Sequence, residues 1–259
     1  MRITRSIVPN LFTLINLFMG FTAIVYASRG DLISAALFIF IAAIFDMLDG
    51  AVARLLKSAS EFGVELDSLC DAVSFGLAPS YMLYKAYFYT YDDIGNIGIL
   101  LASLPALAGV YRLARFNVKL TSLEDKKYFT GLPIPAGALT IITYLIFFHL
   151  RNIIPDDFKS LTIISVTILT SLVMVSKIKF DNLPRPSIRS IKQNPVIFSI
   201  LVVAIIGTIV TKGIFVFPFM LFYIVASGLR HLVVWLKATP EAADDIDESE
   251  QDEPSPYEI

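Results

Sequence analysis

Four aspartates in one short segment are the residues of this chain best suited to carry out chemistry. They stand in the stretch FDMLDGAVARLLKSASEFGVELDSLCDAVSFG, which covers residues 45–76. Asp46 and Asp49 are three residues apart, and Asp67 and Asp71 are four apart. On a helix, both spacings place the two carboxylates of a pair on one face. The loop between the pairs is short, so we expect two antiparallel neighbouring helices whose acidic pairs can meet.

A cluster of four carboxylates needs compensating positive charge, because the negative charges repel one another. Arg54 and Lys57 are close in the sequence but are too few. Oxygen ligands suit hard divalent cations such as Mg²⁺ or Mn²⁺, and two such ions would balance four charges. Two ions bridged by carboxylates can also hold a phosphoryl group during an in-line displacement. The spacing therefore favours metal-assisted chemistry on a substrate that contains phosphate.

Spacing alone leaves two further roles open for the aspartates. Aspartates near helix ends can be surface caps, and acidic groups inside a membrane can belong to a divalent cation transporter. A transporter usually places its acids near the bilayer midplane, on broken helices related by repeats. Asp46 lies about 22 Å along a helix from Asp31, and the hydrocarbon core of a membrane is about 30 Å thick. Asp46 is therefore expected in the cytoplasmic third of the bilayer. We therefore favour a shallow site near the cytoplasmic surface.

Small residues beside the acids leave room for a ligand. Gly50 follows an aspartate directly, Ala53 lies about one turn further on, and Gly63 precedes the second pair. Such residues let a ligand approach the backbone closely, although helix packing alone would account for any one of them. Arg54 suits a diphosphate group, because its guanidinium can form paired, charge-assisted hydrogen bonds with phosphate oxygens.

The elements that must position these residues are apolar helices. The chain has 259 residues, of which 56% are hydrophobic and 17% charged, and its mean hydropathy is +0.69. This composition is far too apolar for a soluble domain and favours membrane-crossing helices of roughly 20 residues. We expect an all-α fold, a polytopic integral membrane bundle of eight transmembrane helices. The predicted spans are 8–27, 32–53, 66–88, 97–116, 134–150, 161–176, 195–211 and 213–236.

Basic residues predict how the chain is threaded through the membrane. With eight spans both termini lie on one side, and five of the 21 lysines and arginines fall on the other side: Arg29, Lys85, Arg151, Lys159 and Lys212. The remaining sixteen lie on the side of the termini. Lysine and arginine are enriched in cytoplasmic loops. Both termini are therefore predicted to be cytoplasmic, in a multi-pass protein of the cell membrane.

The charge is distributed unevenly along the chain. Residues 241–259 form an acidic tail that we expect to be disordered and solvated, and residues 1–240 form the predicted membrane domain. The inner face of that domain is basic, which suits anionic headgroups or nucleotide phosphates. We expect the lipid bilayer as a partner and no nucleic acid.

The aspartate segment carries a known signature. The residues DMLDGAVARLLKSASEFGVELDSLCD fit the pattern D-x2-D-G-x2-A-R-x8-G-x3-D-x3-D at every specified position. The chain thus resembles the CDP-alcohol phosphatidyltransferases, which transfer a phosphatidyl group from a CDP-linked lipid to an alcohol and release CMP, with a divalent metal pair. The resemblance implies that Asp46, Asp49, Asp67 and Asp71 bind metal and that Asp71 is also the general base.

The same resemblance implies a binding site for the CDP-lipid. The residues at the matching positions are Asp49, Gly50, Ala53, Arg54 and Gly63. The donor it implies is CDP-diacylglycerol or CDP-archaeol, since nothing in the signature selects the lipid chains. Related enzymes are commonly dimers, so a homodimer is a further expectation.

Outside the signature, the chain resembles one branch of the family, the membrane-type phosphatidylserine synthases. The segments that carry this likeness are VPNLFTLINLFMGF (8–21), DAVSFGLAPS (71–80), YRLARFN (111–117), FTGLPIPAGA (129–138) and MVSKIKF (174–180). This branch implies L-serine as the acceptor. Other members of the family that use glycerol 3-phosphate or inositol phosphate remain the alternative.

An acceptor such as serine needs a cation for its carboxylate. Arg112 and Arg115 are three residues apart at the inner end of the fourth predicted span, so they share a helix face. We predict that they bind the serine carboxylate, and that Ser74, about one turn beyond Asp71, lines the same cavity. Ordinary anchoring to lipid phosphates is the alternative role for both arginines.

Overall fold

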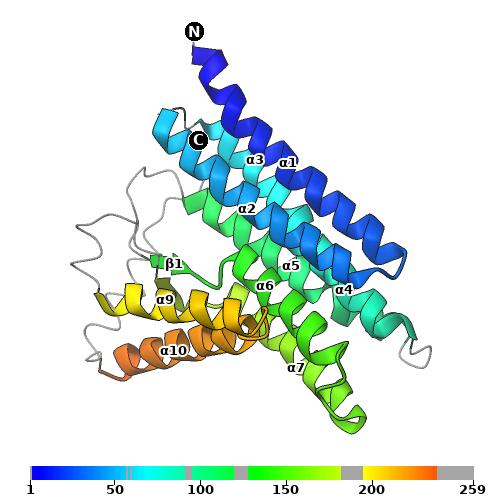
Figure 1. Cartoon of the computed structure of the whole chain (residues 1–259). Helices are drawn as coiled ribbons and strands as arrows, with labels where there is room; N and C mark the ends of the chain where they lie inside the picture. Colours follow the sequence, from blue (N-terminus) through cyan, green and yellow to red (C-terminus); the bar gives the residue numbers. More distant parts are fainter. Residues whose placement is uncertain are drawn as a thin grey trace, which may run out of the picture.

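Long apolar helices make up most of the chain (Figure 1). The computed structural model describes residues 2–56, 58, 60–90, 95–119, 128–181 and 195–237. The predicted acidic tail and Lys57 lie outside these residues. The helices are α1 (Arg2–Ser28), α2 (Leu32–Leu56), α3 (Glu61–Asp71), η1 (Ala72–Leu77), α4 (Ala78–Ala86), η2 (Phe88–Thr90), α5 (Gly95–Lys119), α6 (Ile134–Tyr144), η4 (Leu145–His149), α7 (Asp156–Val175), α9 (Pro195–Val210) and α10 (Val216–Lys237).

Each predicted span falls on a helix or on a continuous helical run, and the all-α prediction is confirmed. Within the described part of the chain, five helices are long and apolar enough to cross a membrane: α1, α2, α5, α7 and α10. The run α6–η4 and helix α9 are apolar but shorter. Five apolar helices fit a membrane-embedded protein, while the number of eight crossings and the orientation stay predictions.

Helices α1 and α2 form a closely packed antiparallel pair (Figure 1). The turn between them uses Gly30, whose φ of +84° favours glycine. Asp31 then accepts the backbone N–H of Ser34 at 3.0 Å and so caps the start of α2. The small residues Ala23 and Ala35 are fully buried in the core and let helix backbones approach closely.

One continuous helical run carries the second acidic pair. It begins at the N-cap Ser60, whose hydroxyl accepts the Gly63 N–H at 3.1 Å. Directly after Asp71 the helix widens into the π-helical turn η1, and it returns to α-helix at Ala78. Pro79 follows this turn; it has no N–H to donate and its ring needs room against the preceding turn. Turns of this kind inside α-helices are frequent at functional sites.

A short antiparallel ladder holds the segment before α6. Strand β1 (Tyr128–Thr130) pairs with β2 (Lys179–Asp181), with Phe129 opposite Phe180. Gly131 follows β1 with a φ of +77°, and a Cβ atom there would meet the Met174 carbonyl. The ladder therefore ties the entry of α6 to the segment that follows α7.

Candidate functional site

Three of the four aspartates lie together between α2 and α3. Asp46, Asp49 and Asp67 each offer a carboxylate oxygen, and these oxygens all lie within 4.8 Å of one another. Asp49 is buried, and the other two are half-buried. The expectation that the two acidic segments meet is confirmed for these three carboxylates, although α3 packs mainly against α1 and not against α2.

Asp71 completes the group from the end of α3. It is 6% exposed and interacts electrostatically with Asp46 and Asp67. It lies one turn beyond Asp67 and is as little exposed as Asp49. All four carboxyl groups therefore interact within one region of the protein.

The cluster fits a divalent cation. Oδ1 of Asp67 is buried and has no hydrogen-bond partner among the residues that the structure describes. An unpaired buried carboxylate oxygen, with two further carboxylates within 4.8 Å, is costly unless a positive charge compensates it. Oxygen donors of this kind are those that Mg²⁺ and Mn²⁺ prefer. The residues present could therefore bind a divalent metal ion.

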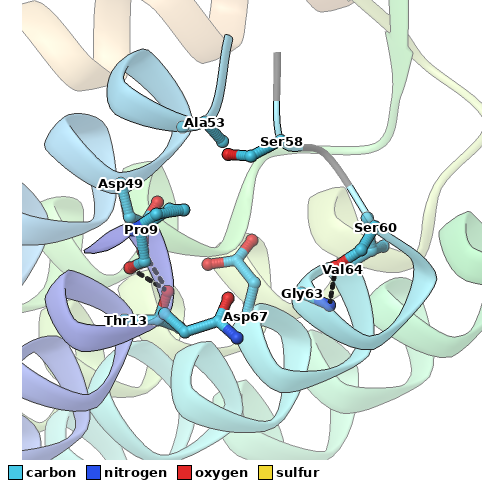
Figure 2. Close-up of a pocket in the computed structure, with 11 residues that line it drawn as sticks. Pro9, Thr13, Asp49, Ala53, Ser58, Ser60, Gly63, Val64 and Asp67 are labelled. Carbon is cyan, nitrogen blue, oxygen red and sulfur yellow. Dashed lines mark hydrogen bonds between the residues drawn. The ribbon is translucent and has the colours of Figure 1, made fainter. Parts of the chain in front are cut away.

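A cavity of about 130 Å³ adjoins the cluster (Figure 2). Four of the five predicted CDP-lipid residues line it: Asp49, Gly50, Ala53 and Gly63. In Figure 2, Asp67 lies between Asp49 on one side and the start of α3 on the other. Ala53 and Ser58 lie next to each other near the top of the view. The cavity thus extends from the carboxylates toward the α2–α3 loop.

Both predicted glycines in this region have a neighbour that a side chain would crowd. A Cβ atom at Gly63 would lie 3.2 Å from Ser60 Oγ and 3.5 Å from Asn10 Oδ1. A Cβ atom at Gly50 would lie 3.3 Å from Nη1 of Arg54, whose side chain is exposed beside the cavity. Arg54, the residue predicted to bind the diphosphate, is therefore next to the cavity but does not line it.

Two polar residues of α1 contact the carboxylates, and the sequence prediction did not include them. The Thr13 hydroxyl is 2.8 Å from Asp49 Oδ2, and Asn16 Nδ2 donates to Asp71 Oδ1 at 3.1 Å. Thr13 and Asn16 are three residues apart, so they share a helix face. That spacing within a mainly apolar segment, VPNLFTLINLFMGF, was the signal that could have identified them, and Asn10 continues it.

The two predicted serine-binding arginines have different surroundings. Arg112 is 6% exposed and interacts electrostatically with Asp71. Arg115 instead donates to three backbone carbonyls, those of Val175 at 2.8 Å, Ser176 at 3.1 Å and Thr130 at 3.3 Å. Arg112 is therefore buried within electrostatic range of Asp71, whereas Arg115 links α5 to the end of α7 and to β1.

Ser74, the third residue predicted to bind serine, is fully buried next to Asn16. Its hydroxyl donates to the backbone carbonyl of Asn16 at 3.0 Å. Its hydroxyl hydrogen is thus already used within the protein. The assignment of Ser74, Arg112 and Arg115 to a serine site stays a prediction.

A separate polar network joins the acidic helix α3 to α5. Asn117 donates to Glu65 Oε2 at 3.2 Å and to Ser68 Oγ at 3.0 Å. Ser68 lies next to Asp67 in the chain, and Asn117 lies two residues beyond Arg115. These contacts therefore set the aspartates of α3 in a fixed relation to the arginines of α5.

Comparisons with known proteins agree with this geometry. The sequence model of the CDP-alcohol phosphatidyltransferases matches residues 6–180. The CDP-diacylglycerol–serine O-phosphatidyltransferase of Helicobacter pylori is 34% identical over 230 residues, which are 88% of this chain and 92% of the relative. The protein of the same name from Methanocaldococcus jannaschii is 37% identical over 179 residues, 68% of this chain and 75% of the relative. The archaetidylserine synthase of Methanothermobacter thermautotrophicus is 37% identical over 174 residues, 66% and 68% of the two chains.

Proposed function

Because the chain belongs to the CDP-alcohol phosphatidyltransferase family, we propose that it transfers a phosphatidyl or archaetidyl group from a CDP-lipid to the hydroxyl of L-serine and releases CMP. The observation that carries the proposal is the group of three carboxylate oxygens within 4.8 Å, beside a cavity lined by residues of the family signature. The names of the relatives support serine as the acceptor.

The proposal covers two kinds of lipid donor. Relatives named for CDP-diacylglycerol and for archaetidyl transfer are each 37% identical to this chain over similar lengths. The diacylglycerol or archaeol chains would remain among the apolar outer faces of the helices, which carry exposed side chains such as Phe18, Phe21, Leu37 and Phe40. The CDP head would enter the polar cavity.

The aspartates are the proposed metal ligands. Asp46, Asp49, Asp67 and Asp71 would hold two ions of Mg²⁺ or Mn²⁺. When bound, the ions supply positive charge that offsets the charge of the diphosphate and of the departing CMP. Thr13 keeps one oxygen of Asp49 in a fixed direction through its hydroxyl.

The remaining residues of the cavity would bind the donor. Gly50, Ala53 and Gly63 leave space along the backbone for the CDP moiety, and Asp49 stands at the same wall. The exposed Arg54 guanidinium is placed to reach phosphate oxygens at the mouth of the cavity. In this proposal these residues orient the diphosphate and position its lipid-bearing phosphorus beside Asp71.

The proposed reaction is a direct displacement at that phosphorus. The serine hydroxyl oxygen forms a bond to the phosphorus, and its proton moves to the carboxylate of Asp71. The bond from the phosphorus to the oxygen of CMP breaks, and CMP leaves with that electron pair. Arg112, buried beside Asp71, is the proposed partner of the serine carboxylate.

The wider assembly follows from the same proposal. The membrane domain of residues 1–240 would lie in the cell membrane with both termini in the cytoplasm, and it would pair with a second copy as a homodimer. The cavity would then open on the side where CDP-lipid head groups and serine are available.

A transfer assay with several acceptors tests the function. Purified protein is mixed with CDP-diacylglycerol or CDP-archaeol and Mg²⁺ or Mn²⁺, and CMP release is followed together with the mass of the lipid product. Serine should give the fastest release and glycerol 3-phosphate or inositol phosphate little. Faster release with one of those phosphates would overturn serine as the acceptor. Mn²⁺ uptake into proteoliposomes without CDP-lipid would instead support a cation transporter.

A further inference from the structure

Asn16 of α1 contacts both sides of the point where the acidic helix changes its geometry. Its Nδ2 donates to Asp71 Oδ1 at 3.1 Å, and its backbone carbonyl accepts the Ser74 hydroxyl at 3.0 Å. Asp71 ends α3, and Ser74 lies in the π-helical turn η1 that follows. Asn16 and Ser74 are fully buried. The asparagine is therefore fixed to this helix through its side chain and its backbone.

The backbones of α1 and η1 lie in direct contact near this residue. A Cβ atom at Gly20 would collide with Ser74 Oγ and would lie 2.6 Å from Ser74 Cα. Gly20 is four residues beyond Asn16, so it marks the same face of α1 one turn further on. Helix packing, and not only the asparagine side chain, thus sets the distance between the amide and Asp71.

The orientation of the amide follows from the chemistry of its partner. Nδ2 of Asn16 donates to Asp71, which suits the ionised carboxylate that the proposed reaction requires, because such a group only accepts hydrogen bonds. The other side, Oδ1 of Asn16, is buried and has no hydrogen-bond partner within the described parts of the chain. A buried unpaired carbonyl costs free energy. An apolar side chain of the same size would remove this carbonyl but would leave Oδ1 of Asp71 without its donor, so the amide matters chiefly for Asp71.

We infer that Asn16 is a positioning residue for the proposed transfer: it holds Oδ1 of Asp71 and so fixes how that carboxylate faces the reacting groups. The torsion of an aspartate carboxylate is broad, and its rotation interchanges the two oxygens. With Oδ1 held by Asn16, Asp71 offers the same oxygen in every turnover. This inference rests on the proposed function, in which Asp71 accepts the proton of the acceptor hydroxyl.

Two substitutions remove the amide donor in different ways. Asn16→Leu keeps the size of the side chain, and Asn16→Ser leaves a small polar group too short to reach Asp71. The matched control is Thr167→Val, because Thr167 is fully buried in α7 and donates only within that helix, to the Ile163 carbonyl at 2.7 Å. This control loses a buried hydrogen bond away from the aspartates. If Asn16→Leu does not fold, Asn16→Ser decides the question.

The measurements are kcat and KM for the CDP-lipid, the Mn²⁺ concentration for half-maximal CDP-lipid binding, and the melting temperature. Loss of a residue that orients a reacting group costs about 10–100-fold, so kcat should fall by that factor. KM should stay within about twofold of the control, and the Mn²⁺ requirement, to which Asp71 also contributes as a proposed ligand, should rise by less than kcat falls. Wild-type kcat would overturn the inference, and so would a rise in KM and Mn²⁺ requirement equal to the fall in kcat.

The choice of acceptor separates this inference from the proposed function. Turnover is measured with whichever acceptor, water included, gives the fastest CMP release from the wild-type protein. If that acceptor is not serine, the proposed function fails on its acceptor. The Asn16 variants are then compared with the same acceptor, and their kcat still supports or overturns the positioning role.

Discussion

The Thr13 hydroxyl lies 2.8 Å from Oδ2 of Asp49 and so joins α1 to the carboxylate cluster on α2. Thr13→Val keeps the shape of the side chain but removes this donor. We expect the Mn²⁺ concentration for half-maximal activity to rise about 10-fold, because partners of a metal ligand typically contribute 10–100-fold to metal affinity. Thr22→Val is the matched control, since Thr22 lies on an exposed face of α1 and bonds only to the Phe18 carbonyl. Equal metal requirements in both variants would contradict the expectation.

The three clustered aspartates should each be indispensable. Asp46→Asn, Asp49→Asn and Asp67→Asn each remove one negative ligand from oxygens that lie within 4.8 Å of one another. CMP release should fall by at least about 100-fold, more than the typical loss from a supporting partner. Chelation of the metal should abolish activity, and added Mg²⁺ or Mn²⁺ should restore it. Near wild-type turnover in one variant at low metal concentration would remove that residue from the ligand set.

Asp71→Asn separates proton transfer from donor binding. Transfer should fall by about 10²–10⁴-fold, the usual loss on removing a general base. Binding of the CDP-lipid in the presence of Mn²⁺ should change little, because Asp46, Asp49 and Asp67 remain. Equilibrium binding and single-turnover kinetics measure the two effects separately. A fall in affinity as large as the fall in rate would make Asp71 chiefly a metal ligand.

Arg112→Gln and Arg115→Gln should have different effects although the two arginines are three residues apart. Loss of a charge-assisted hydrogen bond costs about 1.5–3 kcal/mol, so Arg112→Gln should raise the KM for serine about 10- to 150-fold. Arg115→Gln should mainly lower the melting temperature, because its guanidinium bonds to the carbonyls of Val175, Ser176 and Thr130. Titrations of serine and CDP-lipid check both variants. A higher CDP-lipid KM with an unchanged serine KM in Arg112→Gln would indicate a lipid-phosphate anchor.

The sequence predicted the helices and the acidic site for definable physical reasons. Runs of apolar residues mark the long helices, although the third predicted span misses the start of α3 at Glu61. Fixed spacings of three and four place Asp46 with Asp49 and Asp67 with Asp71 on shared faces. The short loop between the pairs predicted that their carboxylates would meet, but not that α3 packs mainly against α1. Local pattern was therefore sufficient for this part of the site.

Contacts between distant segments were not predictable in the same way. Thr13 and Asn16 meet carboxylates that lie 36 and 55 positions away, and a single polar residue in an apolar helix gives no sign of its partner. Arg115 was predicted to bind serine from its spacing to Arg112, but its carbonyl partners lie 15, 60 and 61 positions away. No local spacing of residues predicts the π-helical turn after Asp71.

The contacts of α1 also have a consequence for the order in which the protein is made. Thr13 and Asn16 lie in the first helix to be synthesised, yet their side-chain partners belong to α2 and α3. At about 5–20 residues per second, translation reaches these partners roughly 2–11 s later. During that interval α1 carries two polar groups without Asp49 and Asp71. The contacts with Asp49 and Asp71 should therefore fix α1 in place only once α2 and α3 have entered the membrane.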